Sequence, residues 1–455
     1  MKIKFLNIIA SLCLAAFTIT SCLDSDEIEF EFSENASITN FSINNIDTKV
    51  TVKKNGKDTV IIKTLFGADY KFSINQNTGE IFNVDSLPLG TDVTKVVPNI
   101  TADTPGIYMV SDKDTIWRDG DSLNFEKPIK FKVMAYTGKF GRVYTAHVNV
   151  HQQNPDTITW AKINGNFHKL IQEQKAVYAN NQIFVFSKQQ DYVFMTNSIN
   201  GKDWSNLRST NLPQFADYRS VMYWNNSFYI LANHDLYISN DGITWEKSTA
   251  ALKFNQLVAN IELPNSKKIT AITEDGLYAE SSNGTEWNIF EEIPSSFPQN
   301  SNYVSYPLRT NTNLGRLVVM GPSAASDSTT VAWGQLATEH DWAQMSYEDN
   351  ESLCPNFENP TLIHYNNQLY AFGGPVRTKK VTPAFQNFYS SADHGISWKK
   401  ETKILAFPET FASLYGIAKG NYSCVVDKDN HIWFMWGNSG EVWRGRINRL
   451  GFEKQ

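Results

Sequence analysis

The chain has 455 residues, about three times the ~150 residues of a typical domain, so we expect two or three domains. Apolar residues make up 41% and charged residues 19% of the sequence, which excludes a chain that is disordered over most of its length. The net charge of −6 argues against nucleic acid as a partner, because phosphate binding needs a clustered basic field. Aromatic residues at 13% favour β-strands.

Residues 1–21 predict a signal peptide. Lys2 and Lys4 precede a largely apolar stretch at residues 5–17, which is shorter than the ~20 residues of a membrane-spanning helix. The sequence Ile-Thr-Ser-Cys at residues 19–22 resembles a relaxed bacterial lipobox. The resemblance implies cleavage before Cys22 and acylation of Cys22, so that lipid chains tether the protein. A plain secretory cleavage near Ser21 is the alternative.

Residues 22–35 predict an acidic tether. Four of the seven residues at 23–29 are acidic, and such a segment repels itself and cannot bury enough apolar area to fold. The tract resembles the export signal of surface-exposed lipoproteins in Gram-negative bacteria. This resemblance implies an outer-membrane lipoprotein on the cell surface, with a periplasm-facing position as the alternative. Of the two remaining cysteines, Cys354 and Cys424, we expect separate buried thiols, although a disulfide is the alternative.

Residues 36–153 predict a β-sandwich of immunoglobulin-like size that serves as a rigid spacer. The segments 48–53, 130–135 and 143–150 alternate apolar and polar residues, which is the pattern of strands with one buried face. Residues 77–79 read as a hairpin turn. Gly-Asp-Ser-Leu at 120–123 resembles the serine motif of a lipase and esterase family, but no downstream Asp-x-x-His follows, so we expect Ser122 to lie in a β-turn.

Residues 154–455 contain a repeat. Four segments, 198–204, 239–245, 281–287 and 391–398, each begin with Ser, contain Asn or Asp and then Gly, and end with Trp. They resemble the Asp-box of sialidase-like β-propellers; residues 338–342 are a worn fifth copy, and residues 368–374 resemble a kelch strand. In such a turn Asn or Asp accepts amide hydrogen bonds and Gly adopts positive φ, so these residues are scaffold.

The spacing of the tryptophans predicts six blades. Successive repeats of about 40 to 55 residues each correspond to a four-stranded blade. The segment around Trp160 is a fourth strand with no blade before it, while the C-terminal segment has three strands and no fourth. We therefore expect the first segment to complete the last blade, which closes the ring and removes its free edges. The fold class is all-β, with an immunoglobulin-like β-sandwich followed by a six-bladed β-propeller.

The longer connections predict the functional face. The repeated turns connect the third and fourth strands of each blade, whereas residues 288–302, 321–328, 346–359 and 373–386 lengthen the other set of loops. Long loops carry function more often than short ones, so we expect the binding site opposite the repeated turns. Aromatic residues supply stacking area and Arg supplies a planar fork; the candidate contacts are Tyr218, Arg219, His234, Arg377 and Trp436. The alternative for Trp436 is packing within the ring of blades, and the alternative for the other four is ordinary solvated surface.

Enzymatic signals are weak. Sialidases carry three Arg and an Arg-Ile-Pro before the first box, and no Arg here is followed by Ile-Pro. The eight His show no metal-ligand spacing, so we expect no metal and no cofactor. The leading hypothesis is a lipid-anchored, non-catalytic surface protein whose propeller binds a glycan or a protein. A glycoside hydrolase of sialidase-like fold with a non-standard active site is the alternative.

Overall fold

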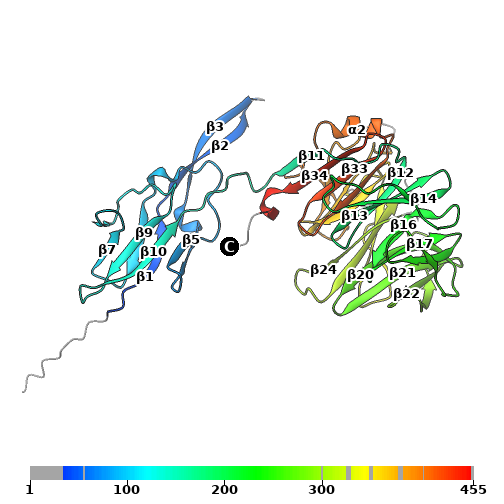
Figure 1. Ribbon diagram of the computed structural model, residues 1–455, viewed down its shortest axis with the longest axis horizontal. Coiled ribbons are helices and arrows are strands. Elements are labelled where there is room, and N and C mark those ends of the chain that lie inside the picture. Colours follow the sequence, from blue (N-terminus) through cyan, green and yellow to red (C-terminus); the bar gives the residue numbers. More distant parts are fainter. Residues whose placement is uncertain are drawn as a thin grey trace, which may run out of the picture. The chain divides into compact units, whose positions relative to one another are not determined.

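The computed structural model describes residues 34–54, 57–298, 301–323, 329–347, 352–377, 383–402 and 404–451. Cys22, the signal peptide and most of the acidic tether lie outside these residues. The described chain forms two compact units that divide between Gln153 and Asn154 (Figure 1). Both units are built from strands, so the all-β prediction is confirmed.

In the N-terminal unit, the part of the chain that the structure describes forms one six-stranded sheet and two small sheets. The large sheet has the order β4-β5-β10-β9-β7-β8. Its strands are β4 (Phe72–Asn75), β5 (Glu80–Asn83), β7 (Gly106–Met109), β8 (Thr115–Ile116), β9 (Ile129–Met134) and β10 (Phe140–His147). The small sheets pair β1 (Ile38–Ile43) with β6 (Pro98–Ala102) and β2 (Ile46–Lys54) with β3 (Lys57–Leu65). Two short 3-10 helices are η1 (Gly67–Asp69) and η2 (Val93–Lys95).

The predicted alternation places the expected residues in the core of this unit. Tyr144 and Ala146 of β10 are fully buried and pack in one cluster with Phe131 of β9 and Phe41 of β1. The β1–β6 pair therefore forms a second layer over the large sheet. The hairpin at residues 77–79 joins β4 to β5, and Gly79 has φ +75°, a conformation that favours glycine.

The two layers differ in size and in strand direction from the two antiparallel sheets of the predicted sandwich. The second layer has only two strands, and β5 pairs with β10 in parallel. A parallel pair between strands that are distant in sequence leaves no local signal, unlike a hairpin. Ser122 lies in the segment between β8 and β9, and Asp121, beside it, accepts a hydrogen bond from the Arg118 amide. This is the geometry of a turn.

The described residues of the C-terminal unit form six four-stranded sheets. The first five are β12-β13-β14-β15, β16-β17-β18-β19, β20-β21-β22-β23, β24-β25-β26-β27 and β28-β29-β30-β31; the sixth is β32-β33-β34-β11. The bounds in the first three are β12 (Glu173–Ala179), β13 (Gln182–Gln189), β14 (Tyr192–Ser198), β15 (Arg208–Ser209), β16 (Asp217–Trp224), β17 (Ser227–Ala232), β18 (Asp235–Ser239), β19 (Glu246–Lys247), β20 (Phe254–Leu263), β21 (Ser266–Thr273), β22 (Leu277–Ser281) and β23 (Asn288–Glu292).

The remaining strands are β24 (Asn302–Pro307), β25 (Gly315–Pro322), β26 (Thr330–Leu336), β27 (Ala343–Gln344), β28 (Thr361–Tyr365), β29 (Gln368–Phe372), β30 (Tyr389–Ser391), β31 (Lys399–Lys400), β32 (Tyr422–Val426), β33 (Ile432–Trp436), β34 (Glu441–Ile447) and β11 (Ile158–Ile163). A short helix α2 (Phe411–Ile417) precedes β32, and η3 (Asn448–Gly451) follows β34. The first strands contact one another in the cyclic order β12, β16, β20, β24, β28, β32 and back to β12, which is the arrangement of a β-propeller.

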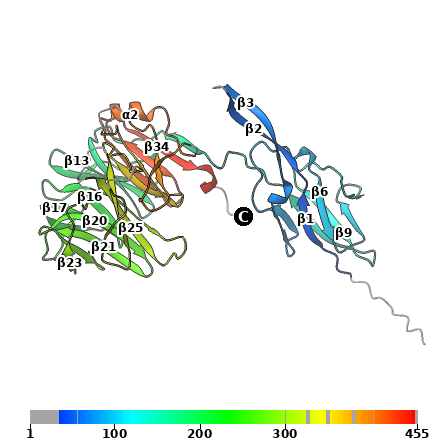
Figure 2. The same ribbon diagram turned by 180° about the vertical axis from the view of Figure 1, so that it is seen from behind.

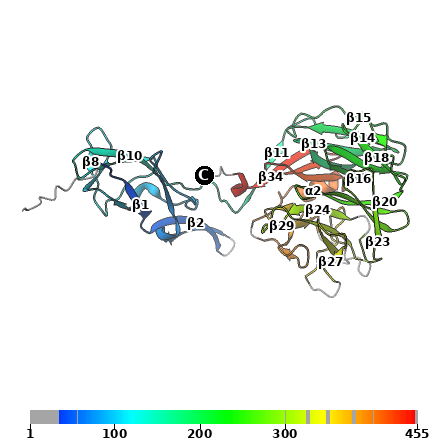
Figure 3. The same cartoon turned by 90° about the horizontal axis from the view of Figure 1, so that it is seen from below.

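The strand that contains Trp160 closes the ring. β11 pairs antiparallel with β34, from Ile158 opposite Ile447 to Ile163 opposite Val442, and the two strands lie side by side in Figures 1 and 3. The indole Nε1 of Trp160 donates a hydrogen bond to the carbonyl oxygen of Ala406. The predicted completion of the last sheet by this N-terminal strand is confirmed.

The four repeated turns have the predicted hydrogen bonds. In residues 239–245, Asp241 Oδ1 accepts from the amides of Ile243 and Thr244 at 2.8 and 2.7 Å, and Ser239 Oγ accepts from the Gly242 amide at 2.9 Å. The same pattern recurs at 198–204, 281–287 and 391–398. The four glycines of these turns all have positive φ. The turns are therefore self-contained and scaffold the outer strands.

The two cysteines of the body are separate thiols. Cys354 is buried and Cys424 is half-buried, and neither forms a disulfide. Burial raises the pKa of the Cys354 thiol to about 12, because the thiolate is poorly solvated there. Among the described residues, no helix combines the length and the apolar character needed to cross a bilayer.

Candidate functional site

The axis of the C-terminal unit contains a cavity of about 1400 Å³. The first strand of each of the six sheets contributes to its wall. These wall segments are residues 174–178, 217–223, 255–257, 302–305, 361–364 and 422–426. The cavity exceeds the ~300–1000 Å³ of most small-molecule sites. It therefore has room for a ligand of several linked rings.

The loops at the cavity belong to one set of connections. Gly276 and Arg377 lie between the second and third strands of their sheets, and Pro322 is the last residue of the second strand β25. Residues 293–297, 356–359 and 420–421 precede the first strand of a sheet. None of the four repeated turns is among the lining residues. The cavity is thus lined by the set of connections that lies opposite the repeated turns.

The wall formed by β12 and β16 carries charge. Lys175 Nζ donates a 2.6 Å hydrogen bond to the carbonyl oxygen of Arg219, which joins the two strands. Burial lowers the pKa of the Lys175 ammonium to about 8, and the neighbouring Asp217 carboxylate opposes this shift. Burial raises the pKa of the Tyr218 hydroxyl. The exposed Arg219 guanidinium lies over the Tyr218 ring, 5.2 Å from its centroid.

On the wall formed by β24 and β28, His364 belongs to a stack of three rings whose other two members lie behind the lining residues. Tyr306 lies between His364, at 4.0 Å between centroids, and His394, at 5.9 Å. The Tyr306 hydroxyl forms a 2.8 Å hydrogen bond with His394 Nδ1. Burial lowers the pKa of the His364 imidazole to about 4, and the nearby His394 contributes to the shift. His364 is therefore neutral at physiological pH and offers the cavity an uncharged polar ring.

Two buried polar atoms lie unpaired where β12 meets β32. Gln174 Nε2 donates hydrogen bonds to the carbonyl oxygens of Met435, at 2.8 Å, and Asn421, at 3.3 Å. Gln174 Oε1 and Ser423 Oγ have no hydrogen-bond partner among the described residues. Both side chains contribute to the cavity wall. An unpaired buried polar group costs about 1–3 kcal/mol, so this seam is polar without being fully satisfied.

The structure brings together three of the five candidate contacts. Tyr218 and Arg219 lie on the β16 wall, and Arg377 lies in the connection that follows β29. His234 is exposed in the tight turn between β17 and β18, with φ +67°, and is not among the lining residues.

Trp436 is not a contact residue. Its side chain is fully buried, and its ring packs against Phe385 and Phe411 at 5.2 and 5.1 Å between centroids. A residue at the end of an apolar strand can lie in the core or at the surface. Trp436 lies in the core, because it belongs to a buried cluster with aromatic residues of α2 and β33. This candidate is corrected to a core residue.

Sequence reasoning missed Lys175, Asp217, Gln174 and His364. Each of them lies in a strand whose sequence pattern is ordinary. Only the arrangement of the six sheets in a ring places the first strands at the axis, where these residues line the cavity. The one available signal was position: a charged residue within the first strand of a propeller sheet is costly to bury unless it faces an axial cavity.

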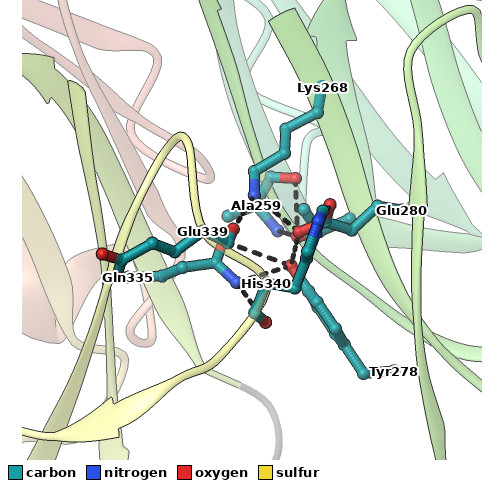
Figure 4. A network of polar contacts seen from close by, with 8 residues as sticks. Ala259, Lys268, Tyr278, Glu280, Gln335, Glu339 and His340 are labelled. Atoms are coloured by element: carbon teal, nitrogen blue, oxygen red, sulfur yellow. Dashed lines mark hydrogen bonds and ion pairs between the residues drawn. The ribbon is translucent and has the colours of Figure 1, made fainter. Parts of the chain in front are cut away.

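A second polar cluster lies between the third and fourth sheets (Figure 4). Lys268 of β21 and Glu280 of β22 form a buried ion pair, and Glu280 also accepts a hydrogen bond from the Tyr278 hydroxyl at 2.7 Å. His340 Nδ1 contacts Glu280 Oε2 at 2.7 Å, and Gln335 Nε2 donates to the His340 carbonyl oxygen at 2.7 Å. None of these residues lines the cavity. Because its members satisfy one another, the cluster is a structural link.

The described residues contain no group of three or more His, Cys, Asp or Glu side chains that is arranged to hold a metal ion. Two carboxylates, Asp217 and Glu292, are among the lining residues. Asp217 Oδ1 accepts a hydrogen bond from the Arg219 amide at 3.0 Å. The wall thus offers carboxylate, ammonium, guanidinium, amide and hydroxyl groups, which suit a polar ligand.

These features define an all-β protein with a β-propeller domain and an axial cavity. The DUF6242 beta propeller domain model matches residues 154–455, and the DUF6242 N-terminal domain model matches residues 41–148. Because the first match alone covers more than half of the chain, the chain belongs to the DUF6242 family. No curated protein matches the sequence.

Several solved structures are similar in part. An auxiliary nutrient binding protein from Bacteroides ovatus has 10% identity and a TM-score of 0.41, with 78% of this chain and 94% of that chain covered. A catalytically inactive virginiamycin B lyase from Staphylococcus aureus has 9% identity and a TM-score of 0.39, covering 64% and 99%. A carbohydrate-active enzyme of family AA12 from Trichoderma reesei has 10% identity and a TM-score of 0.40, covering 64% and 96%. At these TM-scores the likenesses carry no argument about what this chain binds.

Proposed function

We propose that this protein is a lipid-anchored binding protein of the outer-membrane surface, and that the axial cavity takes up an oligosaccharide. In this proposal Cys22 carries the lipid, residues 22–35 are the tether, and residues 36–153 form an immunoglobulin-like spacer. Residues 154–455 form a six-bladed propeller whose repeated turns are Asp-boxes.

The axial cavity is the observation that carries the proposal. A partner protein with a flat surface would need to bury roughly 800 Å² on each side. A concave cavity instead surrounds a small ligand and can contact polar groups on all of its sides. Sugar hydroxyls suit a wall of amide, hydroxyl and charged groups. The exposed side chains of Arg219 and Arg377 come from the second and fifth sheets, so a ligand that contacts both must reach across the axis.

A glycan array with the purified chain tests the proposal. The Arg219→Ala, Arg377→Ala double variant should lose the glycans that the wild type retains, because both guanidinium groups leave the cavity. His234→Ala is the matched control, since His234 is exposed on the same set of connections and does not line the cavity. Normal binding by the double variant would place the ligand elsewhere.

Hydrolysis is the second candidate function, because Asp217 and Glu292 both line the cavity. General acid–base cleavage of a glycoside requires two carboxyl groups on either side of the bond. Incubation of retained glycans with the wild type should leave them intact under the binding proposal. Product release that Asp217→Asn or Glu292→Gln abolishes would instead establish a glycosidase.

A further inference from the structure

A half-buried guanidinium lies between the fourth and fifth sheets of the C-terminal unit. Arg316 is in β25 (Figure 2) and shares one face of that strand with Val318 and Met320, which pack against residues of the fifth sheet. Its Nε is buried and has no hydrogen-bond partner, and its Nη1 contacts the Met345 sulfur at 4.0 Å. In the part of the chain that the structure describes, no carboxylate forms an ion pair with Arg316. A charge that is withdrawn from water without a partner is costly.

Tyr306 is fixed on the same face of the fourth sheet. It lies directly opposite Arg316 in the β24–β25 pair, so both side chains are on one face, with Cβ atoms about 4.5–5.5 Å apart. The Tyr306 side chain is buried and lies between the rings of His364 and His394. Its ring and its hydroxyl are therefore held in one position.

His394 comes from the longest of the four repeated turns. Residues 391–398 number eight, whereas the other three turns have seven residues each. His394 has φ +64°, which is uncommon for a residue other than glycine, and its Nδ1 forms a 2.8 Å hydrogen bond with the Tyr306 hydroxyl. The longer turn thus brings a half-buried imidazole close enough to Arg316 for the guanidinium charge to act on it.

The hydrogen bond to Tyr306 determines which His394 nitrogen donates. Burial raises the pKa of the Tyr306 hydroxyl, so Tyr306 keeps its proton and donates it to His394 Nδ1. Burial and the Arg316 charge lower the pKa of the His394 imidazole, and the Asp393 carboxylate opposes this shift. The ring is therefore neutral at physiological pH, and because Nδ1 accepts, Nε2 carries the proton. His394 Nε2 and Arg316 are both hydrogen-bond donors.

A pair of donors of this kind suits an oxyanion. Arg316 offers a planar fork of N–H groups that matches a carboxylate or a sulfate, and hydrogen bonds from a charged donor are about twice as strong as neutral ones. The Asp393 carboxylate does not neutralise Arg316, because it accepts hydrogen bonds from the Ser391 hydroxyl and the Ser397 amide within its own turn. A cation would be repelled by the guanidinium.

We propose that Arg316 and His394 bind one oxyanion group, a carboxylate or a sulfate, at the face of the C-terminal unit that carries the repeated turns. The site lies outside the axial cavity, since neither residue is among the residues that line the cavity. It is independent of the proposed function, because an acidic group binds here whether or not the cavity takes up an oligosaccharide.

Thermal unfolding of the chain without residues 1–22, which retains every described residue, tests the proposal. Sodium sulfate or sodium acetate is added while sodium chloride holds the ionic strength constant. The wild-type midpoint should rise and level off with at least one of the two anions, because an anion that binds only the folded state stabilises that state. Sulfate and acetate, tested separately, show whether the site accepts a tetrahedral group, a planar group or both.

Two variants connect the effect to the site. Arg316→Gln should weaken binding at least about tenfold, because the charge-assisted hydrogen bonds are lost. His394→Asn should weaken it about threefold, because the shorter Asn tolerates the positive φ but lacks the Nε2 donor. Arg208→Gln is the matched control, since Arg208 is exposed in the first sheet. A rise of equal size in all four chains is a general effect of salt, and that result, or no rise in the wild type, overturns the proposal.

Chemical protection gives a second measurement that needs no variant. Phenylglyoxal reacts with accessible guanidinium groups, and mass spectrometry of peptides gives the rate at each arginine. The anion that raises the unfolding midpoint should slow the modification of Arg316 and leave that of Arg208 unchanged. Equal rates at Arg316 with and without the anion overturn the proposal, even where the midpoint rises.

Discussion

The Trp160 indole Nε1 donates a 2.8 Å hydrogen bond to the carbonyl oxygen of Ala406, 246 residues later in the chain. The Trp160 ring also packs against Phe411 and Phe434, at 5.4 and 5.7 Å between centroids. This single side chain therefore joins the first strand of the unit to α2 and to β33. Ring closure depends on it more than on the exposed residues of β11.

Trp160→Ala should lower the free energy of unfolding by about 2–4 kcal/mol, because it removes a half-buried indole and its hydrogen bond. Gly445→Ala should also destabilise, since a Cβ at Gly445 would lie 2.4 Å from the Trp160 ring. The double variant should be less destabilised than the sum, because the clash disappears with the indole. Urea unfolding measures all three; strict additivity would show that the ring does not pack on Gly445.

His364 should make the protein acid-sensitive. Its pKa is lowered to about 4 in the folded protein, against about 6.5 when unfolded. Between pH 6.5 and pH 4 the unfolded chain binds the extra proton, so stability is fully present above pH 6.5 and is lost as pH falls toward 4. The loss should be on the order of 2 kcal/mol.

His364→Phe keeps the stack on Tyr306 and has no proton to bind. Its free energy of unfolding should therefore fall less than that of the wild type between pH 6.5 and pH 4. His234→Phe, at an exposed turn, should follow the wild-type profile. Urea unfolding across this pH range measures these free energies. Parallel pH profiles for His364→Phe and the wild type would show that His364 does not cause the acid sensitivity.

Lys175 should make the free energy of unfolding depend on pH in the alkaline range. Its folded pKa is about 8, below the ~10.4 of an unfolded lysine, so the unfolded chain binds more protons between these values. Stability from this group therefore rises as pH increases from 8 to 10.4. The difference in unfolding free energy between wild type and Lys175→Met should shift in favour of the wild type over this window. Lys202→Met, at an exposed position, should show no such shift.

Local features of this molecule were predictable from sequence. In residues 239–245, Asp241, Gly242 and Trp245 interact within one turn, so a short motif contains the whole interaction. The closing strand was predictable because Trp160 lacks a preceding blade and the C-terminal segment lacks a fourth strand. The hairpin from β4 to β5 was predictable because its turn is specified by three consecutive residues, 77–79.

Long-range relationships were not predictable. The parallel pairing of β5 with β10 joins residues about 65 apart, and no local pattern specifies it. Trp436 and Arg377 both stand beside connections of the same kind, yet one is fully buried among aromatic rings and the other is exposed at the cavity. That difference arises from α2, which packs over β33.

The Lys268–Glu280 pair (Figure 4) should be strongly coupled. Both side chains are less than one tenth exposed, and Lys268 also donates to the Glu339 carbonyl oxygen at 2.6 Å. Residues 338–342 lack the Ser and Gly of the other repeated turns, so this pair supplies the anchor that the turn itself does not contain.

Glu280→Leu alone should destabilise by about 3–5 kcal/mol, because it leaves the buried Lys268 ammonium without its carboxylate partner. Lys268→Met should cost less, because Glu280 keeps its contacts with the Tyr278 hydroxyl and with His340. The double variant should recover a large part of the loss, since it buries two apolar side chains in place of two charges. Lys247→Met is the control, because Lys247 pairs with Asp235 at the exposed surface, where an ion pair contributes little to stability. Chemical unfolding of the four chains gives the coupling energy, and a value near zero would mean that the two charges are solvated independently.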